Sequence, residues 1–179
     1  MQPSSTELIL IRVTGEDRPG LTSSVTEILA KYDATILDIG QADIHNTLSL
    51  GILFKSEERH SGFIMKELLF KASSLGVTIR FEPITTEQYD NWVGMQGKNR
   101  YILTVLGRKL SARQISAATS VLAEQGMNID AIKRLTGRIP LDECDTDART
   151  RACIEFSVRG TPKDRIAMQE SLMKLASEL

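Results

Sequence analysis

The sequence predicts an α+β protein with two ferredoxin-like βαββαβ units in tandem, the second of which lacks its last strand. An apolar helical stripe that returns 104 positions later indicates the repeat. Ile64, Leu68 and Leu75 correspond in this way to Met168, Leu172 and Leu179. Similar strand and helix patterns precede both stripes. An alternating strand, residues 77–81, follows only the first stripe, so we expect the chain to be a piece of a longer protein.

The first unit, residues 6–82, opens with a strand and a helix. The run Leu8–Val13 is apolar apart from Arg12, which predicts a strand covered on both faces. Two glycines and a proline between positions 14 and 20 end this strand. The helix that follows ends near Tyr32. Its stripe recurs with helical spacing at Leu21, Val25, Ile28 and Leu29.

The rest of the first unit is expected to contain a strand, a tight connection, an alternating strand, a polar loop, a helix and a last strand. In that order they cover 35–44, 43–46, 48–54, 55–61, 62–75 and 77–81. The complete unit therefore follows the order βαββαβ.

Residues 83–99 are expected to form a linker, and residues 100–179 the second unit. The only tryptophan, Trp92, is expected to pack into a crevice between the two domains. Ser111 suits the N-cap of the second unit's first helix. Pro162 suits the first turn of its last helix. Its strands are predicted at 101–106, 128–136 and 152–158.

The βαββαβ order predicts a four-stranded antiparallel sheet with two helices on one face. Right-handed crossovers place the first and third strands in the middle and the fourth beside the first. Without a fourth strand, the second unit leaves the edge of 101–106 unpaired. An unpaired apolar edge invites strand addition from another chain.

Composition argues against several classes of partner. The 179 residues are 41% hydrophobic and 25% charged, with a net charge of −1, so neither nucleic acid nor an anionic membrane is expected as partner. No apolar run approaches the ~18 residues of a membrane span. Residues 1–6 lack a signal-peptide pattern, which predicts a cytoplasmic location. Cys144 and Cys153 are then expected to be free thiols.

The segment Asp17-Arg18-Pro19-Gly20-Leu21, between a strand and a helix, is the strongest local signal for a ligand site. Gly20 removes a side chain, so that a small ligand can approach the backbone. The helix that follows offers free N–H groups and a positive dipole end, which suit the α-carboxylate of an amino acid. A purely structural turn is the alternative.

A βαββαβ repeat with Asp-Arg-Pro-Gly at its first strand–helix loop resembles the ACT domain, a small regulatory module that binds amino acids. Residues 105–108 and 126–135 are similar to the second ACT unit of bacterial phosphoserine phosphatases. In that family a tandem ACT region precedes a haloacid-dehalogenase-type catalytic domain that makes L-serine from phosphoserine. One departure is Gly107-Arg108-Lys109-Leu110, which stands where the first unit has its Pro-Gly turn.

The resemblance implies a regulatory region that senses L-serine or a related small amino acid. It places the ligand at an interface between units, against the first loop of one unit and the second strand of another. The implied residues are Asp17, Arg18, Gly20 and Leu21 on one side and Asn128 and Asp130 on the other. Loop N–H groups would hold the carboxylate, and Asp or the Asn amide oxygen the ammonium. A solvated strand start is the alternative for Asn128 and Asp130.

The resemblance also implies a homodimer, with the protein's own catalytic domain as a partner. We expect residues 1–179 to hold no catalytic residue, metal ligand or cofactor, and Mg²⁺ to belong to the catalytic domain. Asp145-Thr146-Asp147 resembles the nucleophile motif of haloacid-dehalogenase phosphatases. That motif follows a buried strand, whereas this segment is expected to lie in a polar loop. His45 and His60 stand too far apart in the sequence to suggest a metal pair.

Three other functions stay open. The first is a dimerisation or structural ACT scaffold that binds no ligand. The second is a stand-alone tandem ACT regulator that acts through protein partners. The third is an enzyme or RNA-binding domain on the same fold. RNA binding is disfavoured because each predicted third strand carries a single Phe, where stacking on RNA requires aromatic side chains.

Overall fold

The computed structural model describes residues 5–96, 99–108, 111–137 and 151–178. The chain divides into two units, Met1–Gly94 and Met95–Leu179. Lys109, Leu110, Cys144, the Asp145–Asp147 segment and Leu179 lie outside the described residues.

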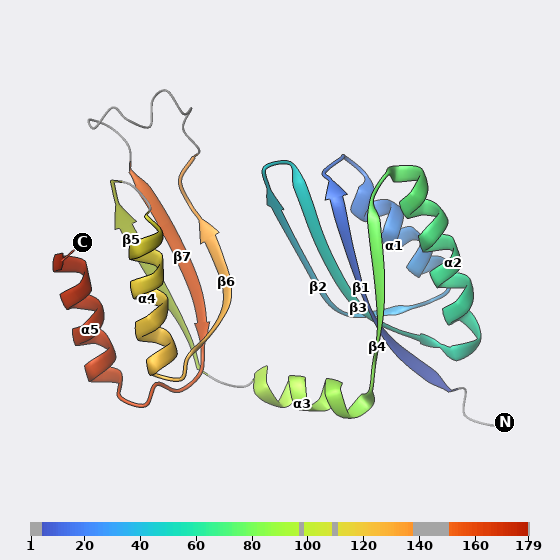
Figure 1. Cartoon of the computed structure of the whole chain (residues 1–179). Coiled ribbons are helices and arrows are strands. Elements are labelled where there is room, and N and C mark those ends of the chain that lie inside the picture. The colour runs from blue at the N-terminus through green and yellow to red at the C-terminus, as the bar shows by residue number, and fades with distance from the viewer. Residues whose placement is uncertain (1–4, 97–98, 109–110, 138–150, 179) are drawn as a thin grey trace. The chain divides into compact units, whose positions relative to one another are not determined.

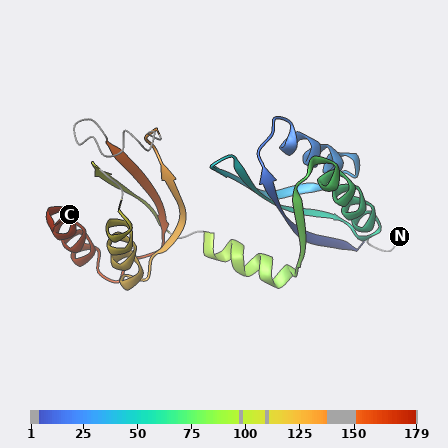
Figure 2. The same cartoon turned by 45° about the horizontal axis from the view of Figure 1, so that its top comes forward.

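The first unit has the predicted order βαββαβ, with a four-stranded sheet in the order β2-β3-β1-β4. All neighbouring strands are antiparallel, and β1 and β3 are central, as predicted. Both helices cover the same face of this sheet (Figures 1 and 2). The bounds are β1 Thr6–Glu16, α1 Leu21–Lys31, β2 Thr35–Ile44, β3 Thr47–Glu57, α2 Glu58–Leu75 and β4 Thr78–Ile84.

The core of the first unit lies between the sheet and its two helices. Alternate residues of β1 and β3 point into it, together with the predicted stripes of α1 and α2. Its central members are Ile9, Ile11, Val13, Leu21, Val25, Leu29, Leu48, Leu50, Ile52, Phe54, Ile64 and Leu68. Burial of each large apolar side chain contributes about 1.5–3 kcal/mol, so this cluster is the main source of stability of the unit.

The predicted polar loop over 55–61 is wrong, because β3 runs to Glu57 and α2 begins at Glu58. The polar residues Ser56 and Ser61 are in fact buried, and their hydroxyl groups hydrogen-bond to each other at 3.0 Å. This pairing satisfies two polar groups that looked solvated in the sequence. An acidic residue in the first turn of a helix also interacts favourably with its dipole, as Glu58 does.

The segment after β4 contains a helix, α3 (Thr86–Gln96). Thr85 caps this helix reciprocally: its Oγ1 accepts from Gln88 N at 3.1 Å, and its N–H donates to Gln88 Oε1 at 2.9 Å. Tyr89 and Trp92 then line a hollow of about 320 Å³ against the paired residues Leu10 and Leu53 of the sheet. Trp92 therefore lies against the sheet of its own unit, on the face opposite α1 and α2.

The second unit has a three-stranded sheet in the order β5-β7-β6, so that β5 forms an edge as predicted. Its helices lie together on one face of the sheet (Figures 1 and 2). The bounds are β5 Arg100–Gly107, α4 Ala112–Glu124, β6 Asn128–Arg134, β7 Ala152–Arg159 and α5 Arg165–Glu178. A smaller buried cluster forms its core: Leu122, Met127, Phe156, Val158 and Met168.

The two helix starts of the second unit differ in how well the sequence predicts them. Ser111 caps α4 as predicted, in a capping box with Gln114. The last helix begins at Arg165, so the prediction that Pro162 lies in its first turn is wrong. Asp164 Oδ1 accepts from the N–H groups of Ile166 and Ala167, at 2.9 and 3.0 Å. A carboxylate cap of this kind fixes the helix start three residues after Pro162.

Candidate ligand-binding site

The loop between β1 and α1 is held at its base by backbone contacts. The Asp17 N–H donates to Asn46 O at 2.8 Å, which ties the loop to the β2–β3 turn. In that turn His45 and Asn46 both have positive φ, as a tight hairpin requires. Gly20 has φ 86°, a left-handed conformation that favours glycine. The sequence Asp17–Gly20 therefore forms a defined and exposed turn at the end of the sheet.

The N-terminus of α1 is available to an anion. Its N-cap residue, Gly20, offers no side-chain hydrogen bond, and the first turn contains no acidic residue. The Leu21 N–H donates to Arg18 O at 3.2 Å and the Ser24 N–H to Gly20 O at 2.9 Å. A helix start that lacks side-chain capping leaves backbone N–H groups and partial positive charge directed at whatever lies in front of it. A carboxylate is a suitable ligand for this position.

Two polar contacts surround this helix start. Arg18 Nη2 donates to Glu16 Oε2 at 2.8 Å, and both side chains are more than half exposed. An exposed ion pair of this kind is weak, so the guanidinium can turn to a ligand at little energetic cost. Thr22 Oγ1 donates to Gln41 Oε1 at 2.8 Å, which links α1 to the edge strand β2.

In the second unit the predicted pair Asn128 and Asp130 lies at the start of β6. Asn128 Nδ2 donates to Asp130 Oδ1 at 3.0 Å. Arg159 Nη2 lies 3.0 Å from the same oxygen, and the side chains of Arg159 and Asp130 are only 14% and 24% exposed. Sequence reasoning missed Arg159. The signal is its register, because Arg159 is the strand partner of Asn128.

The structure thus places Asp17, Arg18, Gly20 and Leu21 in one loop of the first unit. It places Asn128 and Asp130 side by side in the second unit. Arg159 already neutralises the Asp130 carboxylate, which leaves the Asn128 amide oxygen as the better acceptor for an ammonium group.

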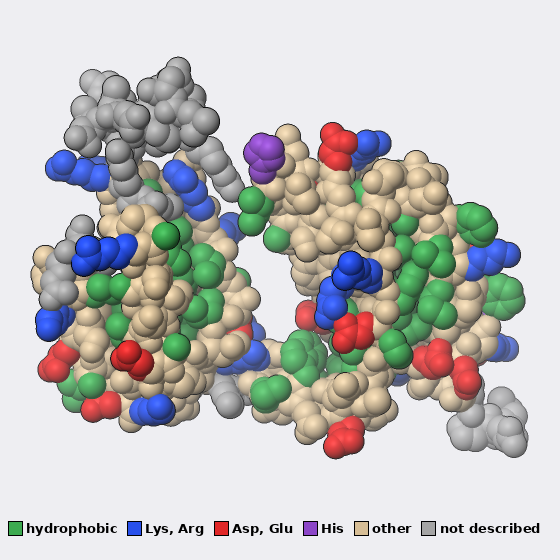
Figure 3. All heavy atoms as spheres, viewed as in Figure 1, with side chains coloured by type: hydrophobic (Ala, Val, Ile, Leu, Met, Phe, Trp, Pro, Cys, Tyr) green, Lys and Arg blue, Asp and Glu red, His purple; other side chains and the backbone are tan. Residues whose placement is uncertain are grey.

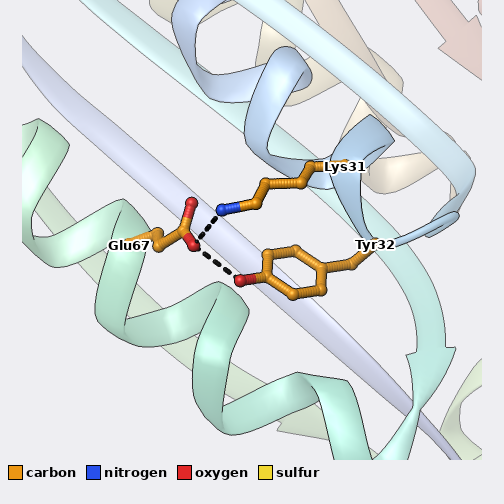
Figure 4. Close-up of polar contacts among 3 residues, drawn as sticks. All are labelled: Lys31, Tyr32 and Glu67. Carbon is orange, nitrogen blue, oxygen red and sulfur yellow. Dashed lines mark hydrogen bonds and ion pairs between the residues drawn. The ribbon is translucent and has the colours of Figure 1, made fainter.

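A second polar cluster joins α1 to α2. Glu67 Oε1 accepts from Lys31 Nζ at 2.5 Å and from Tyr32 Oη at 2.6 Å (Figure 4). The hydrogen bond from Lys31, then that from Tyr32, lowers the pKa of Glu67 below its ordinary value. The hydrogen bond to Glu67 in turn raises the pKa of Lys31 and the pKa of Tyr32. The cluster links the two helices, and no pattern in the sequence indicates that these three residues meet.

Within the described residues, His, Cys, Asp and Glu form no group of three that could hold a metal ion. Basic and acidic side chains are interspersed on the face that Figure 3 shows.

Among the helices that the structure describes, none is both long enough and apolar enough to cross a membrane.

Two family models match the chain, and both are described as an ACT domain. One covers residues 7–82 and the other residues 100–179. The family that the sequence resembles is thereby confirmed in both units, as is the ferredoxin-like fold class.

Two curated relatives are phosphoserine phosphatases. Phosphoserine phosphatase SerB2 of Mycobacterium tuberculosis is 30% identical over 129 residues, which are 72% of this chain and 31% of the relative. A phosphoserine phosphatase of Streptomyces coelicolor is 31% identical over 160 residues, 89% of this chain and 35% of the relative. The chain therefore spans about a third of the length of these relatives.

Among solved structures, a protein of Galdieria sulphuraria is similar with a TM-score of 0.73 at 19% identity. The likeness covers 98% of this chain and 94% of that protein. At this identity it shows the shared fold alone.

Proposed function

Because the chain is a tandem of two ACT domains, we propose that it is the amino-acid-binding regulatory region of a phosphoserine phosphatase. Its ligand is L-serine or a related small amino acid. The observation that carries this proposal is the start of α1, which has an exposed Asp17–Gly20 turn and no side-chain cap. A tandem ACT chain whose helix α1 starts in this way is suited to hold an α-carboxylate.

The binding chemistry follows from the groups in the two loops. The first backbone N–H groups of α1 hold the α-carboxylate, and Arg18 turns from Glu16 to assist. The Asp17 carboxylate, or the Asn128 amide oxygen of another unit, accepts from the ammonium group. Binding regulates the protein only if the ligand has different affinities for two arrangements of the units.

The remaining parts of the proposal concern the whole protein. Phosphatase activity would reside in a haloacid-dehalogenase-type domain with Mg²⁺, and not in the two ACT domains. The ACT region would form a homodimer and pass the effect of the ligand to that catalytic domain. The compartment we propose is the cytoplasm.

Calorimetric titration of the 179-residue chain with L-serine tests the proposal, with L-alanine and phosphoserine as comparison ligands. We expect saturable binding of L-serine. The variant at whichever residue accepts from the ammonium group, Asp17→Asn or Asn128→Ala, should weaken it about tenfold or more, because the first removes the carboxylate charge and the second removes the amide acceptor. Asp90→Asn is the matched control, since Asp90 is an exposed carboxylate of α3 in the same unit as Asp17. A folded chain that gives no heat with any of these ligands would contradict the proposal.

A dimerisation scaffold without a ligand is the second candidate. The half-buried pair of Asp130 and Arg159 favours it, because a carboxylate with such a partner has a structural role in its own unit. This function predicts that Asp130→Asn alters the stability or association of the chain, measured by sedimentation, while no amino acid binds.

A further inference from the structure

The hollow beside Trp92 lies between α3 and the face of the first sheet that is opposite α1 and α2. Its volume is about 320 Å³, and each of the four strands contributes one residue to its lining. All of its walls belong to the first unit, whose sheet has all four strands of the βαββαβ order. The lining residues are Leu10, Asp38, Leu53 and Ile84 of the sheet and Gln88, Tyr89 and Trp92 of α3.

Most of this lining is apolar or aromatic. Leu10 and Leu53 are strand partners at the base of the hollow, and Leu53 is only 9% exposed. Tyr89 and Trp92 are both partly buried, with ring centroids 5.9 Å apart and ring planes inclined by 41°. Aromatic rings bury apolar surface and also attract a cation to their faces. The hollow therefore suits a ligand that has a compact apolar body.

A β-bulge directs a carboxylate to the hollow. The register of β2 against β3 shifts between Ile36 and Asp38, so that Asp38 lies opposite Leu53. Bulges of this kind re-aim a side chain. Without the shift, Leu37 would stand opposite Leu53, and the hollow would carry no negative charge at this position.

The Asp38 carboxylate has no partner within the described part of the chain. It forms neither a hydrogen bond nor an ion pair there. On the same face of the sheet Arg12 pairs with Glu82 at 2.8 Å. Lys55, two residues beyond Leu53, forms no ion pair with any described residue. A carboxylate beside aromatic rings is complementary to an organic cation.

The second unit has the same bulge without the charge. Its register shifts between Ile129 and Ala131. Ala131, opposite Ser157, therefore occupies the position of Asp38. The bulge is thus a shared feature of the two sheets, whereas the carboxylate belongs to the first unit alone. Packing of the fold does not require a carboxylate at this position.

We propose that this hollow binds a small organic cation, a primary ammonium ion on a compact apolar body. The ammonium group lies against the Asp38 carboxylate and the aromatic rings, and the apolar body lies on Leu10 and Leu53. Among the described residues no Lys or Arg lines the hollow, so the carboxylate of an amino acid would find no partner there. The site is therefore separate from the carboxylate site proposed at the start of α1.

Cyclohexylmethylamine, which is protonated at pH 7, is the probe, and the intact 179-residue chain is the target. Fluorescence of Trp92, the only tryptophan, reports binding. Cyclohexylmethanol has nearly the same shape without the charge. We expect saturable binding of the amine, at least about fivefold tighter than that of the alcohol, because only the amine interacts with the carboxylate and the ring faces as a cation. Added salt should reduce this preference, since Asp38 is exposed.

Variants of the chain locate the site. Asp38→Asn should weaken binding of the amine at least about threefold and leave that of the alcohol unchanged, because it removes the charge and keeps the size of the side chain. Asp43→Asn is the matched control, since Asp43 is an exposed carboxylate of β2 that does not line the hollow. Tyr89→Leu keeps apolar contact but removes a ring, and it should weaken binding of the amine about threefold.

Three results would overturn the proposal. One is the absence of a saturable change in Trp92 fluorescence with the amine, and another is an affinity for the amine no higher than that for the alcohol. The third is an equal effect of Asp38→Asn and Asp43→Asn on binding of the amine. The comparison of the two ligands on the unchanged chain needs no substitution, so it tests the charge preference even if a variant does not fold.

Discussion

The helices α1 and α4 occupy the same place in the two units and begin in different ways. α4 starts at Ser111, whose hydroxyl accepts from Gln114 N at 3.2 Å in a capping box. α1 starts at Gly20, which has no side chain to cap it. The capping box thus satisfies the Gln114 N–H of α4 within the unit, while no side chain caps the first turn of α1. This difference between two copies of one fold supports the proposal of a carboxylate site in the first unit.

The helix–sheet cores provide a second contrast between the units. Leu68 of α2 is 1% exposed, while Leu172, its counterpart 104 positions later, is only partly buried. The strand β4 covers the edge of the core in the first unit, which explains why Leu68 is less exposed than Leu172. The units should therefore respond differently to the same substitution.

Leu68→Ala is expected to have the largest effect, a loss of about 2–5 kcal/mol in the free energy of unfolding of the first unit. Leu172→Ala should destabilise the second unit less, because its side chain buries less surface. Trp92 fluorescence during denaturation reports on the first unit, and hydrogen exchange of β7 amides reports on the second. Equal losses in the two units would show that β4 does not close the first core.

Gly15→Ala tests the contrast between the two units near the ends of β1 and β5. The added Cβ would lie 2.6 Å from Val77 Cγ1, and such overpacking costs about 1–3 kcal/mol. Gly107 of β5 is opposite Ala152 as Gly15 of β1 is opposite Leu48, and it lines a hollow of about 630 Å³. Gly107→Ala should therefore leave the second unit nearly unchanged, because its methyl group enters that hollow. Trp92 fluorescence during denaturation measures the loss in the first unit, and hydrogen exchange of β7 amides measures the loss in the second. A larger loss for Gly107→Ala would refute the equivalence of these glycines.

Periodic elements were predictable from the sequence, because burial imposes their pattern. The stripe Leu21, Val25 and Leu29 and the alternation in β3 both identify core positions. The buried pair Ser56 and Ser61 escaped prediction, because two polar groups that satisfy each other look solvated in a sequence.

The candidate site was predictable in part. The Asp17–Gly20 turn has a local signature, whereas the contact of Arg159 with Asp130 depends on strand register. A sequence therefore predicts a turn formed by neighbouring residues. It does not predict a contact between distant residues unless the pairing of the strands is known.

Ser111→Ala tests the contrast between the helix starts. Loss of the capping hydroxyl should destabilise the second unit by about 1 kcal/mol, while Ser111→Gly should cost only a few tenths. Hydrogen exchange in the first turn of α4 measures the effect. We also expect Ser111→Ala to leave L-serine binding unchanged, because the proposed carboxylate site is at α1. A loss of binding would assign the anion site to the second unit.

The smallest expected effect concerns Glu67, at the contact of α1 and α2. By the same 104-residue spacing the second unit has Ser171 in its place, so the cluster belongs to the first unit alone. Lys31, and after it Tyr32, lowers the pKa of Glu67 below the ordinary 4.5. A lowered pKa in the folded state adds stability above the ordinary value, and this stability is lost as the pH falls through the lowered value. The contribution is small because the groups are solvated.

Denaturation followed through Trp92 between about pH 6 and pH 3 measures this contribution. The first unit of the unchanged chain should lose stability below pH 4.5 more steeply than that of Glu67→Gln. Glu27→Gln is the matched control: Glu27 is an exposed carboxylate of α1 that accepts only a local hydrogen bond, from Ser23. The raised pKa values of Lys31 and Tyr32 predict a second loss on the alkaline side, as the pH rises above about 10. If Glu67→Gln and Glu27→Gln flatten the acid limb equally, general surface charge explains the pH dependence and the cluster does not distinguish the two units.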